Sequence, residues 1–115
     1  MTATPETFLP LTPATFHILL ALAEGEKHGY GIMQEVAEGS AGALRIGPGT
    51  LYGSLKRLMG DGLVEEVADR VSDDPRRRYY RLTALGRAVA RAEALRLESM
   101  VRTARSRNLI GPAGA

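Results

Sequence analysis

The stretch that decides the fold is Gly47–Leu63, which reads G-P-G-T-L-Y-G-S-L-K-R-L-M-G-D-G-L. Its large apolar residues are spaced as one buried stripe of an α-helix. They are Leu51, Leu55, Leu58 and Met59. A proline in the first turn and two glycines after the stripe are typical of the start and the end of a helix. The stretch therefore predicts an amphipathic helix of about three turns.

The other faces of this helix carry hydroxyl groups, an aromatic ring and two cations, namely Thr50, Tyr52, Ser54, Lys56 and Arg57. Such a helix can lie in the major groove of DNA, where cations meet phosphates and hydroxyl groups reach base edges or sugars. An ordinary surface helix is the alternative on this stretch alone. Tyr52 borders the apolar stripe and fits core packing and DNA contact equally well, and Tyr30 is similar.

Charge is segregated along the 115 residues, although the net charge is only +2. Residues 44–60 hold three basic residues and no acid, and residues 76–81 hold four arginines and no acid. Between them, residues 61–75 hold six acids and one base. Thirteen of the fifteen basic residues are arginine, the type that suits phosphate and guanine. Two cationic patches around an acidic segment favour nucleic acid as the partner.

Composition predicts one domain with a modest core, since 44% of the residues are hydrophobic. The absence of cysteine excludes disulfides and thiolate metal sites. No apolar run has the length of a membrane span, and no basic segment precedes an apolar one at the N-terminus. We therefore expect a cytoplasmic protein without a membrane partner.

Before the deciding stretch, periodicity predicts helices over residues 13–23, after an N-cap at Thr12, and over residues 29–38. Residues 1–11 are expected to form a flexible N-terminal arm, with some of its apolar residues docked on the body. Residues 44–46 alternate around Arg45 as in a very short strand.

After Gly62 the apolar period changes to about two, which predicts strands over residues 63–68 and 77–82 joined by a charged turn. Tyr80 and Leu82 are the expected inward side chains. A hairpin after a helix-turn-helix is a wing, and residues 12–83 are thus predicted to form a winged helix DNA-binding domain. The arginines at its tip, Arg76, Arg77 and Arg78, favour phosphate or minor-groove contact over a merely solvated tip.

A last helix is predicted over residues 84–108, capped by Thr83, with residues 109–115 as a flexible tail. It extends about 37 Å, and a domain of this size cannot cover its apolar stripe. A second copy packed around a twofold axis would cover it, which predicts a C-terminal dimerisation helix. Whether the first helix joins that interface stays open. The candidate dimerisation residues are Phe16, Leu19, Leu85, Val89, Ala92 and Leu95.

The chain resembles the PadR family of bacterial transcriptional regulators, in the small subfamily with one C-terminal helix. The segments that carry this resemblance are H-G-Y-G-I at His28–Ile32, G-P-G-T-L-Y-G-S-L-K-R-L at Gly47–Leu58, D-G-L-V at Asp61–Val64 and R-R-Y-Y-R-L-T-A-L-G-R at Arg77–Arg87. The resemblance implies a winged helix-turn-helix, a homodimer, operator binding and usually repression. It also implies that DNA is faced by Tyr30, Thr50, Tyr52, Ser54, Lys56 and the arginines at 76–78.

The resemblance further implies a switch that responds to a ligand or to stress in many members. Some members bind flat drugs between aromatic side chains in the dimer pore. This sequence has no tryptophan, and its last helix has no aromatic residue, which argues against a pocket of that stacking type.

No cofactor, metal site or catalytic constellation is expected. His17 and His28 are isolated, without carboxylates at ligand spacing. Gly47 and Gly49 lack the strand-loop-helix context of a nucleotide site. The acids near Asp61 have no partner nucleophile.

The sequence thus predicts a mainly α fold with a small β-hairpin, a winged helix-turn-helix plus a long C-terminal helix. Its predicted function is sequence-specific regulation of transcription, as a homodimeric repressor on a pseudo-palindromic operator with a small-molecule effector as a further partner. The alternative is a winged-helix protein-interaction module whose basic wing docks on an acidic protein without binding DNA.

Overall fold

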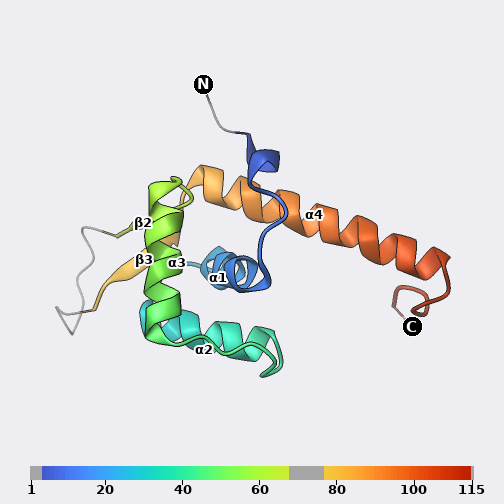
Figure 1. Ribbon diagram of the computed structural model, residues 1–115, viewed down its shortest axis with the longest axis horizontal. Coiled ribbons are helices and arrows are strands. Elements are labelled where there is room, and N and C mark those ends of the chain that lie inside the picture. The colour runs from blue at the N-terminus through green and yellow to red at the C-terminus, as the bar shows by residue number, and fades with distance from the viewer. Residues whose placement is uncertain (1–3, 68–76, 115) are drawn as a thin grey trace.

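The structure of the protein, a computed structural model, describes residues 4–67 and 77–114. These residues form a mainly helical fold with a small antiparallel sheet (Figure 1), which confirms the predicted fold class. In chain order the elements are η1 (Pro5–Phe8, a 3₁₀ turn), α1 (Pro13–Ala23), β1 (Lys27–His28), α2 (Gly29–Gly39), α3 (Pro48–Gly60), β2 (Val64–Glu66), β3 (Tyr79–Leu82) and α4 (Ala84–Ser106).

One core joins the three N-terminal helices, the sheet and the first half of α4. Its fully or nearly fully buried large side chains are Ile18, Leu19, Leu22, Ile32, Val36, Leu51, Leu55, Leu58, Leu63, Val64, Tyr80 and Val89. Burial of each such side chain contributes about 1.5–3 kcal/mol, so this cluster is the main source of stability. Met59, expected in the buried stripe of α3, is instead partly exposed at the edge of that stripe.

The helix α3 ends as its glycines predict. Gly62 has a φ of +77°, the left-handed conformation that a glycine adopts without strain. The N–H of Leu63 then donates to the carbonyl of Leu58 at 2.9 Å, and the N–H of Gly62 donates to the carbonyl of Met59 at 3.1 Å. This closes the last turn and turns the chain directly into β2.

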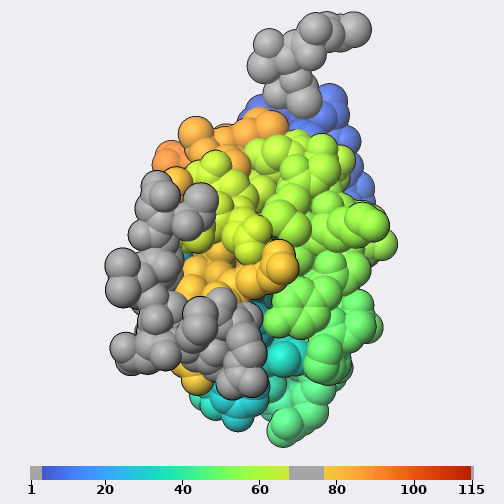
Figure 2. Space-filling view, turned by 90° about the vertical axis from the view of Figure 1, so that its left-hand side faces the viewer, coloured from blue at the N-terminus to red at the C-terminus, as the bar shows by residue number. Residues whose placement is uncertain are grey.

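The sheet has the order β1-β3-β2, and both pairs are antiparallel. We call the β2–β3 hairpin the wing. Within it, Tyr80 is buried and Leu82 is half-buried, so both face inward as predicted. The strand β1 lies between the helices predicted over residues 13–23 and 29–38, where no strand was predicted, and it pairs Lys27 with Tyr80 and His28 with Tyr79. Figure 2 shows the face on which α3 (green) runs beside β3 (orange), with the start of α2 (cyan) next to them.

The predicted strand at 44–46 is wrong, because this segment is a loop. The hydroxyl of Ser40 accepts a hydrogen bond from the N–H of Leu44 at 2.9 Å and donates one to its carbonyl at 3.1 Å. These bonds hold the loop against the end of α2, and Leu44 and Ile46 pack on the core from there.

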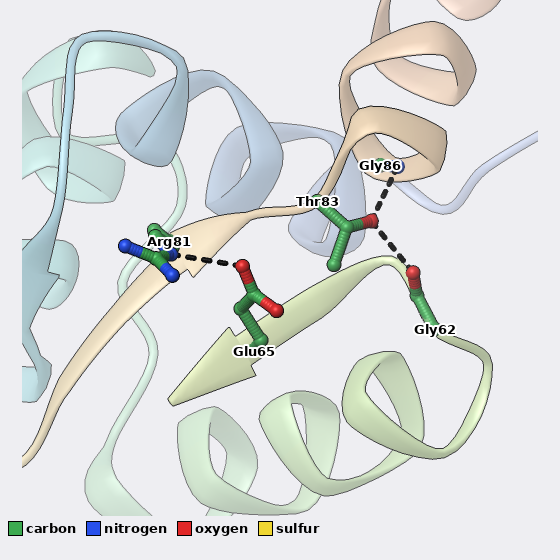
Figure 3. Close-up of polar contacts among 5 residues, drawn as sticks. All are labelled: Gly62, Glu65, Arg81, Thr83 and Gly86. Carbon is green, nitrogen blue, oxygen red and sulfur yellow. Dashed lines mark hydrogen bonds and ion pairs between the residues drawn. The ribbon is translucent and has the colours of Figure 1, made fainter. Parts of the chain in front are cut away.

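The start of α4 is joined closely to the end of α3 (Figure 3). The hydroxyl of Thr83 donates to the carbonyl of Gly62 at 2.6 Å and accepts from the N–H of Gly86 at 2.9 Å. A Cβ atom on Gly86 would lie 1.9 Å from the carbonyl oxygen of Leu63. Only glycine allows the helix to approach the backbone this closely.

The described part of the N-terminal arm is docked on the body through its apolar residues, as expected. Leu9 and Leu11 pack against the core. The N–H of Leu11 donates to a carboxylate oxygen of Glu93 at 2.7 Å, and Arg96 pairs with the other oxygen. Glu93 is buried, and these two partners together with the adjacent apolar contacts hold the arm on α4.

The second half of α4 projects well past the other helices (Figure 1). Two candidate dimerisation residues are corrected here: Leu19 and Val89 are fully buried inside the protomer, because the first half of α4 packs on α1 of the same chain. The large apolar residues that α4 does expose are Leu95, Met100 and Val101. None of the helices in the described ranges combines the length and apolarity needed to cross a bilayer.

Candidate nucleic-acid interface

The outward face of α3 is set by the burial of its inward one. Thr50, Tyr52, Lys56 and Arg57 are all exposed, in agreement with the predicted outward set. Ser54 is a correction, since it is only 4% exposed. Ser54 lies three residues after Leu51 and directly before Leu55, on the side of α3 that packs into the core. Its hydroxyl is 3.5 Å from the guanidinium of Arg57, and it cannot reach a groove.

The wing contributes exposed arginines held by cross-strand carboxylates. Arg78 pairs with Glu66 at 3.4 Å, and Arg81 pairs with Glu65 at 2.8 Å (Figure 3). Arg77 is also exposed. Arg76, the third predicted arginine, lies outside the described residues. Exposed pairs of this kind contribute at most about 1 kcal/mol, so phosphates can compete for the arginines.

The start of α2 lies beside α3 and the wing. Nδ1 of His28 accepts from the N–H of Gly31 at 3.2 Å, which caps the helix. The His28 ring also meets Tyr79 edge to face, with 5.4 Å between the ring centroids. Next to this cap, Tyr30 points outward and is 63% exposed.

Tyr52 leans from α3 over the first residue of α2. A Cβ atom on Gly29 would lie 2.3 Å from the Tyr52 hydroxyl oxygen. Gly29 is buried, and the absence of a side chain there makes room for the tyrosine. The two helices of the helix-turn-helix are therefore in contact at the edge of the candidate interface.

These elements enclose a pocket of about 520 Å³ lined by His28, Gly29, Tyr30, Tyr52, Arg77, Arg78 and Tyr80. The pocket brings together four predicted residues, and among the described residues that line it none is acidic. Thr50, Lys56 and Arg57 lie outside it on the exposed surface of α3. The pocket lies between α3, the start of α2 and β3, on the face that Figure 2 presents.

Sequence reasoning missed His28, Gly29 and Tyr80 as residues of this site. Tyr80 was expected only as hairpin structure, and it is indeed 3% exposed. Burial raises its pKa, Tyr52 and Glu66 raise it further, and Arg78 opposes the rise. The Tyr80 hydroxyl is thus a neutral hydrogen-bond donor at ordinary pH.

Within the described residues, no group of three or more histidine, aspartate or glutamate side chains is arranged to hold a metal ion. The chemistry gathered on this face is that of cations, hydroxyl groups and aromatic rings. It suits an anionic, extended ligand with stacked or sugar-like surfaces.

The helix-turn-helix, the wing and the projecting helix define a winged-helix transcriptional regulator. The chain belongs to the transcriptional regulator PadR-like family, whose model matches residues 18–92. The match contains the helix-turn-helix, the wing and the first part of α4.

Known proteins agree with this class. The chain is 42% identical over 86 residues to the transcriptional regulator Rv3488 of Mycobacterium tuberculosis, which covers 75% of this chain and 77% of the relative. A PadR family transcription regulator from Clostridium difficile shares the fold, with a TM-score of 0.71 at 23% identity over 86% of this chain and all of that one. The PcaV transcriptional regulator from Streptomyces coelicolor, solved with its natural ligand, has a TM-score of 0.68 at 25% identity over 85% and 63% of the two chains.

Proposed function

We propose that this regulator binds operator DNA as a homodimer and represses transcription from a pseudo-palindromic site. The observation that carries the proposal is one face on which α3, the start of α2 and the wing present Tyr30, Tyr52, Arg77 and Arg78 around one pocket. The lining residues that the structure describes include no acid. Lys56 and Arg57 extend this cationic face along α3. With α3 in the major groove, the wing would reach the neighbouring backbone.

Dimerisation is supported by the apolar surface that one chain leaves uncovered. Leu95 is 55% exposed on α4, Met100 and Val101 follow it, and Leu20 is exposed on α1. Among the other candidate residues, Phe16, Leu85 and Ala92 are half-buried and remain available at the rim of such an interface. A twofold pair of chains would present two α3 helices to half-sites about 34 Å apart.

Release by a small molecule is the remaining part of the proposal. It is supported by the PcaV structure, which contains that regulator's natural ligand. An effector acts only if it binds the DNA-free form more tightly than the DNA-bound form. Its signature is a lower operator affinity at saturating effector, with no change in operator preference.

The test is titration of the full chain with DNA from its own promoter and with random DNA of equal length, at several salt concentrations. We expect a clear preference for the promoter and an affinity that falls steeply with salt, since phosphate contacts release counterions. Lys56→Ala should weaken binding to both DNAs and make the salt dependence shallower.

A salt-independent affinity, or equal affinity for promoter and random DNA, would contradict the proposal. A stable complex with an acidic protein in the absence of any DNA affinity would instead favour the protein-interaction module. Unchanged binding by Lys56→Ala would remove only that residue from the interface.

A further inference from the structure

Tyr80 combines deep burial with a hydroxyl that has no partner in the described part of the chain. Its side chain lines the pocket between α3, the start of α2 and the wing, and no hydrogen bond to its hydroxyl is formed there. No fully buried side-chain polar atom of the described residues lacks a partner. The Tyr80 side chain thus forms part of the pocket wall, although the residue as a whole is only 3% exposed.

The groups around this hydroxyl suit one anionic group with several oxygens, such as a phosphate. Tyr52 and Arg78 are close enough to the Tyr80 hydroxyl to influence its ionisation, and both line the same pocket. A protonated phenol donates a hydrogen bond, and a guanidinium donates two in a fork that matches phosphate oxygens. Glu66 is the nearby acid, and it pairs with Arg78 from outside the pocket lining.

The pocket walls are fixed relative to one another. The backbone of Tyr80 pairs with Lys27 of β1, directly before the first turn of α2. Tyr52 is held over Gly29 by close contact, with no room for a side chain there. A donor set positioned before its ligand arrives loses little conformational freedom on binding.

We infer that this pocket holds one backbone phosphate of the operator, and that Tyr80 is a buried donor which positions it, together with Tyr52 and Arg78. The inference rests on the proposed DNA-binding function and assigns Tyr80 a role beyond hairpin structure. A phosphate held there would fix the register of α3 in the groove without reading a base. Removal of the hydroxyl should therefore weaken binding to all DNA sequences alike.

The test pairs Tyr80→Phe with operator duplexes that carry one uncharged methylphosphonate at each backbone position in turn. A hydrogen bond to a charged partner is lost, so Tyr80→Phe should weaken promoter and random DNA alike by about tenfold. At one phosphate per half-site the variant and the methylphosphonate should not be additive, because each removes the same contact. The melting temperature should stay within a few degrees of the wild type.

Tyr79→Phe is the matched control, since Tyr79 is the neighbouring residue of β3 and does not line the pocket. It should show no coupling to that phosphate. Additive effects at every phosphate, or Tyr80→Phe affinity within twofold of the wild type, would overturn the inference while leaving promoter binding intact. If the wild-type chain shows no preference for its promoter, the proposed function itself fails.

Discussion

Gly86 sets how closely α4 approaches the end of α3. A Cβ atom there would meet the carbonyl oxygen, the carbonyl carbon and the Cα of Leu63 at 1.9, 2.8 and 3.2 Å. All three are backbone atoms, and Leu63 is itself fixed by hydrogen bonds to Leu58 and Thr83. Nothing at this contact can rotate away to make room.

Gly86→Ala should therefore lower the free energy of unfolding by about 2–4 kcal/mol, as for overpacking against an immobile neighbour. Urea denaturation of the two proteins measures the difference. Gly60→Ala is the control, because an added methyl group there meets nothing within 4 Å. It should leave stability unchanged or raise it by up to about 1 kcal/mol. Equal effects of the two substitutions would contradict the packing explanation.

Glu93 is a buried carboxylate whose charged form is stabilised in the folded chain. Its hydrogen bond with Arg96 lowers its pKa below the ordinary value of 4.5, burial opposes this, and the Leu11 N–H lowers it further. Because the folded-state pKa lies below that of the unfolded chain, the contribution is complete above about pH 4.5 and is lost as the pH falls through the folded-state value.

Glu93→Gln should thus lower the free energy of unfolding at pH 7 by about 1–3 kcal/mol, the range for a charged hydrogen bond that loses its charge. The difference from the wild type should shrink as the pH falls below about 4.5, through the lowered pKa of Glu93. Denaturation at each pH measures it, and amide exchange at Leu11 should become faster in the variant. A difference that stays constant with pH would show that the carboxylate charge has no part in holding the arm.

At the scale of elements, the wing carries its own counterions. Glu66 pairs with Arg78, which lines the pocket, and Glu65 pairs with Arg81, which does not. Both carboxylates are on the same strand and are similarly exposed. Neutralising either glutamate therefore changes the net charge by the same amount, but each substitution frees a different arginine from its ion pair.

Glu66→Gln should raise operator affinity severalfold at low salt, because Arg78 no longer exchanges a carboxylate for a phosphate. The gain should shrink at high salt, where exposed charges are screened. Glu65→Gln is the matched control and should have a smaller effect. Equal gains from both variants would assign the effect to overall charge and not to Arg78.

The helices and the wing could be predicted because their side chains follow the periods of 3.6 and 2 residues. The strand β1 could not, since two residues such as Lys27 and His28 establish no period, and their pairing depends on the distant Tyr79 and Tyr80. The pocket escaped prediction for the same reason. The burial of Ser54 could have been predicted, because Leu51, Ser54 and Leu55 have the i, i+3, i+4 spacing of one helix face. The hydroxyl group of Ser54 suggested an outward, DNA-facing role instead.

At the scale of the whole molecule, α4 leaves the large apolar side chains Leu95, Met100 and Val101 exposed. The described residues measure 52 × 38 × 23 Å, and the long direction is that of the projecting helix (Figure 1). Leu95 lies near the middle of α4, beside the docked N-terminal arm. A charge at this position would be buried by a second copy but tolerated in a single chain.

Leu95→Arg should shift the protein toward monomer in sedimentation experiments. It should also weaken operator binding by at least tenfold, since two linked DNA-binding domains bind more tightly than one. Ala94→Arg, an exposed position about 100° around the helix, is the control and should stay dimeric. A wild-type chain that is monomeric at micromolar concentration would refute the twofold arrangement. Operator binding by a monomeric Leu95→Arg at full affinity would refute the need for it.

The Thr83 bridge between Gly62 and Gly86 has a mechanical consequence. Thr83 directly precedes α4, and its hydroxyl is bonded to Gly62, two residues before β2, so the start of α4 and the start of the wing are held together. We therefore expect a tilt of α4 to move the arginine-bearing hairpin with it. In the proposed homodimer, regulation through this contact would require only a change in the angle between the two α4 helices, with no unfolding of a hinge.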